Sequence, residues 1–300
     1  MAEFVASMLR SGVPIALAGV GVLFAVRAGI FHLGLEGLML SSAFVAVAVG
    51  RGTDSIWLAV GGALLASAIL SVLYWWLIEH LGADAVIAGL GLTTLSVGGT
   101  AFFLDVIFDV RGRIDSRVAL PRPVRGADDG IGAYVTELSI LGWLTIPLVV
   151  VAWVVLRRTR FGLRLSAVGS FSYGARAAGV DEPRVRLAAM LCASVGAALA
   201  GVEIALGGLS AFSENMTAGR GFIALAAALF GLLHPFGTGL AALFFGSAAA
   251  IGVVTQINSI DSVPRPFILM IPFLVTIAAV SFSSIARRRA IERRSRAGLA

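Results

Sequence analysis

The sequence predicts an all-α protein, a polytopic transmembrane helical bundle of about eight to ten membrane segments that include broken or re-entrant helices. Of its 300 residues, 58% are hydrophobic and only 13% are charged, and the mean hydropathy is +0.96. Such a chain has too little polar surface to cover a soluble globule. Uncharged runs such as 56–78 are also long enough, at about 1.5 Å per helical residue, to cross the roughly 30 Å hydrocarbon core.

The apolar runs follow one another along the whole chain. Those near 13–49 and 207–240 are interrupted by Gly, His, Glu or Pro, which is typical of broken or re-entrant helices sheltered inside the protein. No Pro- or Ser-rich linker divides the chain, so we expect residues 1–300 to form one transmembrane domain. The runs lie at residues 13–26, 35–49, 56–78, 86–108, 138–156, 187–206, 221–233, 239–258 and 266–284.

The arginines predict the orientation of these segments. Seven arginines in residues 157–186 face two acidic residues, and six arginines in the tail 287–300 face one. By the positive-inside rule, both stretches lie in the cytoplasm. The loop 109–137 then lies outside, and four full spans before it would place the N-terminus outside as well. A single re-entrant segment would reverse that last count.

The arginines do not indicate nucleic-acid binding, although the net charge is +6. They lie at the ends of apolar segments and do not alternate with exposed aromatic residues. We therefore expect the lipid bilayer, and no nucleic acid, as a partner.

The basic stretch 157–186 contains glycine-bounded patterns between two membrane segments, Arg160-Phe161-Gly162 followed by Gly169, and Arg176 to Gly179. A short amphipathic helix bounded by glycines could seat in a groove of another protein. An ordinary basic loop that only fixes the topology explains the pattern equally well.

The same stretch resembles the coupling segment of the permease family that serves ABC importers of simple sugars, branched-chain amino acids and nucleosides. That segment reads FGxxxxAxG and then AAxxxG, and it contacts the ATPase. Residues 170–173 replace the acidic or Asn-Pro start that the family usually has. The resemblance implies that ATPase coupling is carried by Arg160, Phe161, Gly162, Gly169, Arg176, Ala177, Ala178 and Gly179.

Three further matches extend the resemblance over nearly the whole chain. Residues 27–40 resemble the GLEG signature of the nucleoside-type branch, with His32 where the family usually has Asn. Residues 83–90 and 221–237 resemble two other stretches of the family. The resemblance implies an inner-membrane permease that pairs with a second, homologous but different permease chain. It also implies ATPase subunits that bind ATP and Mg, with no cofactor in this chain, and an extracytoplasmic substrate-binding lipoprotein or periplasmic protein.

Polar residues near membrane depth are candidates for the substrate path. An ionised Glu36 would cost ~3 kcal/mol at mid-helix unless it is paired or hydrogen-bonded. His32, four residues earlier, could pair with Glu36 on one helical face or share a metal with it, but no third ligand is evident and we expect no metal site. The favoured interpretation is that Glu36 braces a broken helix through backbone N–H groups. The candidates are His32, Glu36, Glu203, Asn215 and Gln256. Hydrogen bonds between helices explain the last three equally well.

The chain contains no lysine and hence no Walker A motif, so ATP hydrolysis must come from a separate subunit. The sequence also lacks the nucleophile elbow and metal motifs of membrane enzymes. We expect the permease of an ATP-driven importer that moves a nucleoside or a related small polar solute by alternating access. A simple-sugar importer is the second alternative, and a secondary transporter driven by an ion gradient is the third.

Overall fold

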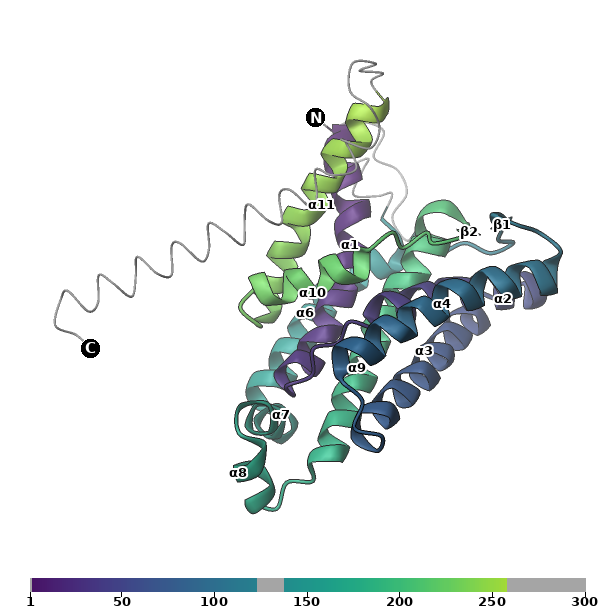
Figure 1. The fold of residues 1–300 in the computed structure, drawn as a ribbon. Helices are drawn as coiled ribbons and strands as arrows, with labels where there is room; N and C mark the ends of the chain where they lie inside the picture. Colours follow the sequence, from purple (N-terminus) through teal and green to yellow (C-terminus); the bar gives the residue numbers. More distant parts are fainter. Residues whose placement is uncertain (1, 123–137, 258–300) are drawn as a thin grey trace.

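The computed structural model describes residues 2–122 and 138–257, and this part of the chain is almost entirely helical (Figure 1). It therefore confirms the predicted all-α class. The helices are α1 (Ala2–Arg27), α2 (Leu35–Thr53), α3 (Ile56–Glu79), α4 (Ala85–Phe108), α6 (Ile140–Arg158), α7 (Arg160–Ser170), α8 (Ser172–Ala177), α9 (Glu182–Val202), a π-helical segment η1 (Glu203–Leu209), α10 (Arg220–Phe230) and α11 (Pro235–Ile257).

Six helical segments are long and apolar enough to cross a membrane: Phe4–Arg27, Leu35–Thr53, Ile56–Glu79, Ala85–Phe108, Ile140–Arg158 and Glu182–Leu209. The positions confirm the predicted runs, with one correction at the start. Helix α1 begins at Ala2, before the apolar run predicted from residue 13, because a helix does not require apolar residues and its first turns include the charged residues Glu3 and Arg10. The predicted run 266–284 and the tail 287–300 lie outside the described residues.

Helix α1 is the centre of the bundle, where it packs against α9, α10 and α11 (Figure 1). Small residues allow the backbones to approach closely, as they do in membrane bundles generally. A Cβ atom on Gly21 of α1 would come within 2.8 Å of the Cα of Gly196 in α9. A Cβ atom on Gly246 of α11 would lie 2.7 Å from the Cα of Gly12. These contacts bury most of α1.

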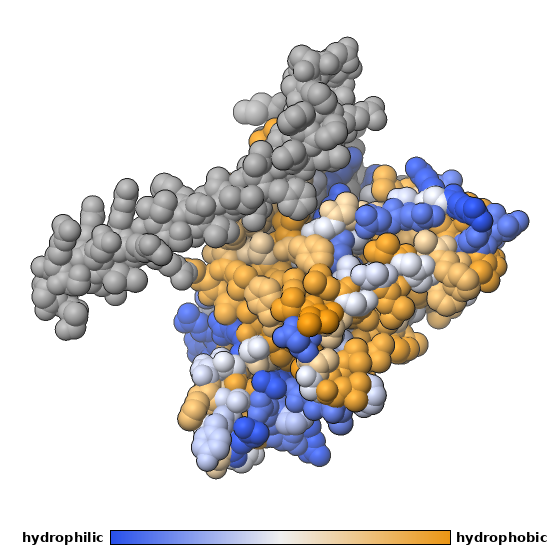
Figure 2. All heavy atoms as spheres, viewed as in Figure 1, coloured by the Kyte–Doolittle hydropathy of each residue, from blue (hydrophilic) through white to orange (hydrophobic). Residues whose placement is uncertain are grey.

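Helices α3 and α4, unlike the buried helix α1, are largely exposed, because most of their side chains point away from the bundle. Their exposed apolar residues include Trp57, Leu65, Ile69, Ile87, Leu95 and Phe102. Figure 2 shows hydrophobic atoms over the middle of the molecule and hydrophilic atoms at the end formed by α7 and α8. An apolar belt of this kind is stable only against lipid, so the chain is a multi-pass membrane protein.

The predicted interruptions occur where the sequence indicated them. Residues 28–34 break the helix between α1 and α2, and α9 changes to the π-helical segment η1 at Glu203. Helix α10 is a short apolar helix of 11 residues, which lies across the bundle in Figure 1. Broken helices at membrane depth are tolerated where the protein itself surrounds them.

A two-stranded antiparallel sheet, which the sequence did not predict, joins two outer segments. Strand β1 (Arg113–Asp115) pairs with β2 (Ala211–Ser213), with Ile114 opposite Phe212. The Glu214 carboxylate accepts a hydrogen bond from the Gly112 backbone nitrogen at 2.8 Å and extends the pairing. The sheet thus fixes the chain after α4 to the chain between η1 and α10.

Candidate functional site

Glu36, at the start of α2, is buried, and both oxygens of its carboxylate accept hydrogen bonds. Its carboxylate accepts hydrogen bonds from the Thr217 hydroxyl at 2.5 Å, the Gly219 nitrogen at 2.8 Å and the Gly221 nitrogen at 2.6 Å. These two nitrogens belong to the N-terminal end of α10, which has no other side-chain cap. We predicted that Glu36 braces a broken helix through backbone N–H groups, and these hydrogen bonds are of that kind. The helix that Glu36 caps, however, begins near Gly221, 185 residues further along the chain.

The possible pairing of His32 with Glu36 is wrong. His32 lies in the non-helical link before α2, so the two side chains do not share a helical face. The imidazole is fully buried and lies against the Tyr74 ring, with 4.6 Å between ring centroids. Neither ring nitrogen has a hydrogen-bond partner among the described residues. The Tyr74 hydroxyl is bonded elsewhere, to the Ala85 carbonyl at 2.7 Å.

Glu203 lines a polar cavity of about 330 Å³ between α1, the start of α6, η1 and the start of α10. The Ser139 hydroxyl donates a short hydrogen bond to the Glu203 carboxylate. Gly207 leaves room for that carboxylate, because a Cβ atom there would lie 2.7 Å from it. The polar side chains on the wall are Arg10, Ser11, Ser139, Glu203, Ser213 and Arg220. The cavity thus combines carboxylate, guanidinium and hydroxyl groups at the end of the bundle where the N-terminus lies (Figure 1).

Of the two remaining candidates, Asn215 does not line this cavity. Asn215 is exposed at a tight turn between β2 and α10, where its φ is +54°. Gln256 falls in the last turns of α11, beyond the side chains that the structure describes. Sequence reasoning missed Ser139 and Arg220, which do line the cavity. A lone arginine beside an apolar run, Arg220, was the one available signal.

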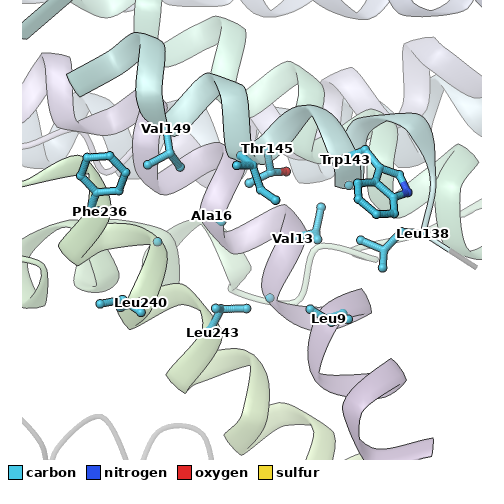
Figure 3. Close-up of a pocket in the computed structure, with 14 residues that line it drawn as sticks. Leu9, Val13, Ala16, Leu138, Trp143, Thr145, Val149, Phe236, Leu240 and Leu243 are labelled. Atoms are coloured by element: carbon cyan, nitrogen blue, oxygen red, sulfur yellow. The ribbon is translucent and has the colours of Figure 1, made fainter. Parts of the chain in front are cut away.

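An apolar groove of about 510 Å³ adjoins the polar cavity along Leu9, Val13 and Leu138. It lies between α1, α6 and α11, and Figure 3 shows Trp143 at the Leu138 end and Phe236 at the other. The indole and Thr145 contribute polar atoms to a wall that is otherwise hydrocarbon. An amphipathic solute could place its polar part beside Glu203 and a flat apolar part beside Trp143.

The predicted coupling stretch forms two helices, α7 and α8, separated at Phe171. The Thr159 hydroxyl caps α7 by accepting a bond from the Gly162 nitrogen at 3.2 Å. No side chain caps α8, which starts where the sequence departs from the family pattern and is only six residues long. Arg176 of α8 contacts Glu182 at 3.3 Å, and Arg186 connects Glu182 to Glu79. This ion-pair chain ties α8 to α9 and α3.

At two of the predicted coupling glycines, Gly169 and Gly179, the local structure itself favours glycine over a residue with a side chain. A Cβ atom on Gly169 would overlap the Arg27 carbonyl oxygen at 1.9 Å, so α7 packs backbone to backbone on the end of α1. Gly179 has φ of +80°, a left-handed conformation that glycine adopts without strain. Phe161 packs partly buried against Phe24 of α1, with ring centroids 6.3 Å apart. Ala177 and Ala178 are exposed.

Three exposed apolar side chains on this segment were missed by the sequence analysis. Leu163, Phe171 and Tyr173 are 72%, 64% and 70% exposed, and the two aromatic rings lie 6.2 Å apart. Arg160 and Arg164 are exposed on the same segment. Large exposed apolar side chains on a segment that also exposes arginines form a surface suited to another protein.

Among the residues that the structure describes, no three His, Cys, Asp or Glu side chains lie close enough together to hold a metal ion. The polar side chains that line the cavity can offer hydrogen bonds and ionic contacts to a solute.

Residues 4–280 match the family described as branched-chain amino acid transport system / permease component. The chain is 32% identical over 288 residues to the nucleoside ABC transporter permease protein NupC of Lactococcus lactis subsp. cremoris, covering 92% of this chain and 90% of that protein. It is 29% identical over 283 residues to the guanosine ABC transporter permease protein NupQ of Bacillus subtilis, with 89% and 88% covered. It is 29% identical over 314 residues to the putative glucose ABC transporter permease protein TsgC13 of Haloferax volcanii, with 94% and 93% covered.

One solved structure shares the fold. The chain resembles a chain of PsaBC from Streptococcus pneumoniae in complex with Fab, with a TM-score of 0.51 and 12% sequence identity, covering 91% of this chain and 89% of the other. The similarity extends over nearly all of both chains, so it concerns the whole bundle and not one motif.

Proposed function

Because the chain belongs to the family of branched-chain amino acid transport system permease components, and is thus a transport subunit and not an enzyme, we propose that the solute carried by this ABC importer permease is a nucleoside. Two of the relatives named for nucleoside or guanosine align with most of this chain and over most of their own length. The putative glucose permease keeps a simple sugar as the second candidate.

The observation that carries the proposal is the polar cavity beside Glu203. A carboxylate accepts hydrogen bonds from a ribose diol or from the N–H groups of a purine, and Arg220 donates to base or ribose oxygens. The adjoining groove offers Trp143 and hydrocarbon to the flat face of a base. A simple sugar uses the polar cavity but has no aromatic face for the groove.

The orientation follows from the basic segment. With α7 and α8 in the cytoplasm, the N-terminus and the Glu203 cavity face outward, toward an extracytoplasmic binding protein. Nucleoside released there would enter the permease pair and leave to the cytoplasm after alternating access. The whole chain acts as one membrane domain in a bacterial inner membrane, beside a second, homologous permease.

The surface of Leu163, Phe171 and Tyr173 is the proposed contact with the ATPase. Closure of the ATPase would push on α7, and the backbone contact at Gly169 would pass the displacement to α1. Helix α1 lines the Glu203 cavity through Leu9, Arg10 and Val13. One helix thus connects the cytoplasmic contact with the outer cavity.

Uptake of labelled guanosine tests the proposal in proteoliposomes that hold the chain with its ATPase and partner permease, with binding protein outside and ATP inside. We expect uptake that requires both ATP and the ATPase. Uptake of glucose but not of guanosine would establish the sugar alternative. Uptake driven by an ion gradient through this chain alone would contradict an importer powered by ATP.

The Glu203→Gln variant tests the cavity itself. Loss of a charged hydrogen-bond acceptor costs about 1.5–3 kcal/mol, so we expect the KM for guanosine to rise roughly tenfold or more. Glu214→Gln is the matched control, because this exposed carboxylate lies at the same end and does not line the cavity. Equal KM values for the two variants would remove Glu203 from the substrate path.

A further inference from the structure

A basic cavity of about 350 Å³ lies between α7 and the first turns of α9. Its wall carries two exposed arginines, Arg164 and Arg184, and one carboxylate, Asp181. Asp181 contacts Arg184 at 3.0 Å, whereas Arg164 forms no ion pair with any residue in the described ranges. The cavity therefore has an excess positive charge that no described acidic side chain neutralises.

The level of this cavity coincides with the cytoplasmic edge of the membrane belt. The Trp75 indole nitrogen donates to the Pro183 carbonyl at 3.1 Å, beside Arg184 in sequence. Trp75 and Trp76 both lie against His80 at the end of α3. Tryptophans gather at the headgroup level of bilayers, because their rings are apolar and their N–H group is polar. The basic cavity thus opens where phospholipid headgroups lie.

A second cavity, of about 310 Å³, adjoins the first at one residue and lies closer to the middle of the membrane-spanning helices. The two share Phe161, and the second runs between α1, α6 and α9 along Phe24, Val155, Val195 and Leu199. Its polar lining consists of Thr145 and the Cys192 thiol. Because the rest of this wall is hydrocarbon, it offers few hydrogen bonds to a polar solute and does not suit the imported substrate.

We propose that this pair of cavities binds one anionic phospholipid of the cytoplasmic leaflet. The phosphate lies between Arg164 and Arg184, and an acyl chain passes Phe161 into the apolar cavity. Arginine suits this role because its guanidinium makes paired hydrogen bonds to phosphate oxygens. A zwitterionic lipid binds more weakly, because its own cation opposes the arginines.

The proposed lipid has a defined structural role. Arg164 belongs to α7 and Arg184 to α9, so a phosphate held by both connects the coupling segment to the membrane bundle. Phe161, at the junction of the two cavities, already packs against Phe24 of α1. The site is independent of which solute is transported, and it can be tested without any transport measurement.

Native mass spectrometry of the full chain, released from detergent with added phosphatidylglycerol or phosphatidylcholine, tests the proposal. We expect one phosphatidylglycerol to remain bound and phosphatidylcholine to be lost. The double variant Arg164→Ala/Arg184→Ala should weaken phosphatidylglycerol binding roughly tenfold or more, because each arginine contributes ~1 kcal/mol near an anionic headgroup. Val195→Trp keeps both arginines, fills the apolar cavity and should also displace the lipid.

Arg158→Ala is the matched control, since Arg158 is exposed on the same side but lines neither cavity. An equal loss of lipid in this control would mean diffuse attraction to a basic surface and would overturn the site. Lipid retained at the wild-type level by the double variant would overturn it as well. Competition by glycerol phosphate as strong as that by phosphatidylglycerol would show a site for free phosphate, with no part for the acyl chain.

Discussion

The carboxylate of Glu36 lies 2.6 Å from the backbone nitrogen of Gly221, which follows it by 185 residues. Helices α2 and α10 therefore begin at the same point, and one anion stabilises both N-terminal ends. Gly221 makes the approach possible, because a Cβ atom there would lie 2.6 Å from the Cα of Glu36. The contact fixes the start of α10, which carries Arg220 into the polar cavity.

Glu36→Ala should destabilise the protein by about 3 kcal/mol. The substitution leaves the Thr217 hydroxyl and two N–H groups without their acceptor in a buried place. Thermal unfolding in nanodiscs measures the effect. Asp54→Asn is the control, because Asp54 is an exposed carboxylate in a left-handed conformation that asparagine tolerates. A melting temperature of Glu36→Ala equal to that of the control would contradict the capping role.

His32→Phe should leave the stability unchanged or raise it. The imidazole is buried without a hydrogen-bond partner among the described residues, and a phenyl ring keeps the contact with Tyr74 without burying polar nitrogens. Tyr74→Phe, in contrast, removes a hydroxyl that is bonded to the Ala85 carbonyl and should lower the stability by about 1 kcal/mol. Comparing the melting temperatures of the two variants tests both expectations. A marked loss of stability in His32→Phe would mean that the imidazole nitrogens have polar partners in the membrane.

Gly169→Ala should separate α7 from α1. The new methyl group would overlap the Arg27 carbonyl oxygen, so the two backbones must move apart at a cost of about 1–3 kcal/mol. We expect a lower melting temperature together with reduced stimulation of the partner ATPase by substrate-loaded binding protein. Gly61→Ala in α3 is the control, because a Cβ atom there meets no atom within 4 Å. Full stimulation in Gly169→Ala would show that this contact does not transmit the motion.

The triple variant Leu163→Ala/Phe171→Ala/Tyr173→Ala should fold normally and bind the ATPase at least roughly tenfold more weakly. All three side chains are mostly exposed, so their removal costs little stability, whereas buried aromatic residues dominate the energy of protein interfaces. Co-purification and ATPase stimulation measure the binding and the coupling. Leu81→Ala, another exposed leucine, in the turn between α3 and α4, is the control. Wild-type ATPase binding by the triple variant would place the interface elsewhere.

The membrane segments could be predicted because each depends on a local property of the chain. A run such as 56–78 must lie in lipid however the rest of the protein packs. An arginine-rich stretch such as 157–186 likewise marks the end of the apolar run before it, whatever the arrangement of the helices. The breaks could be predicted for the same reason, since the polar and glycine residues of 27–37 interrupt an apolar helix. The family resemblance likewise depended on short linear motifs.

The partners of the polar side chains could not be predicted, because they come from distant parts of the chain. The sequence placed His32 and Glu36 four residues apart and allowed them to pair, but the turn before α2 directs His32 to Tyr74 and leaves Glu36 for α10. Nothing in the sequence around Ser139 indicated a role, because its partner Glu203 is 64 residues away in the chain and is adjacent only in the folded structure.

The sequence by itself determined that the protein lies in a lipid bilayer, and the position and order of the membrane-spanning helices that the structure describes, because hydropathy acts residue by residue. Only the tertiary structure decided which polar groups meet. A buried carboxylate such as Glu36 must find donors wherever the packing of the helices presents them, and that packing depends on contacts such as Gly21 with Gly196, between residues far apart in the chain.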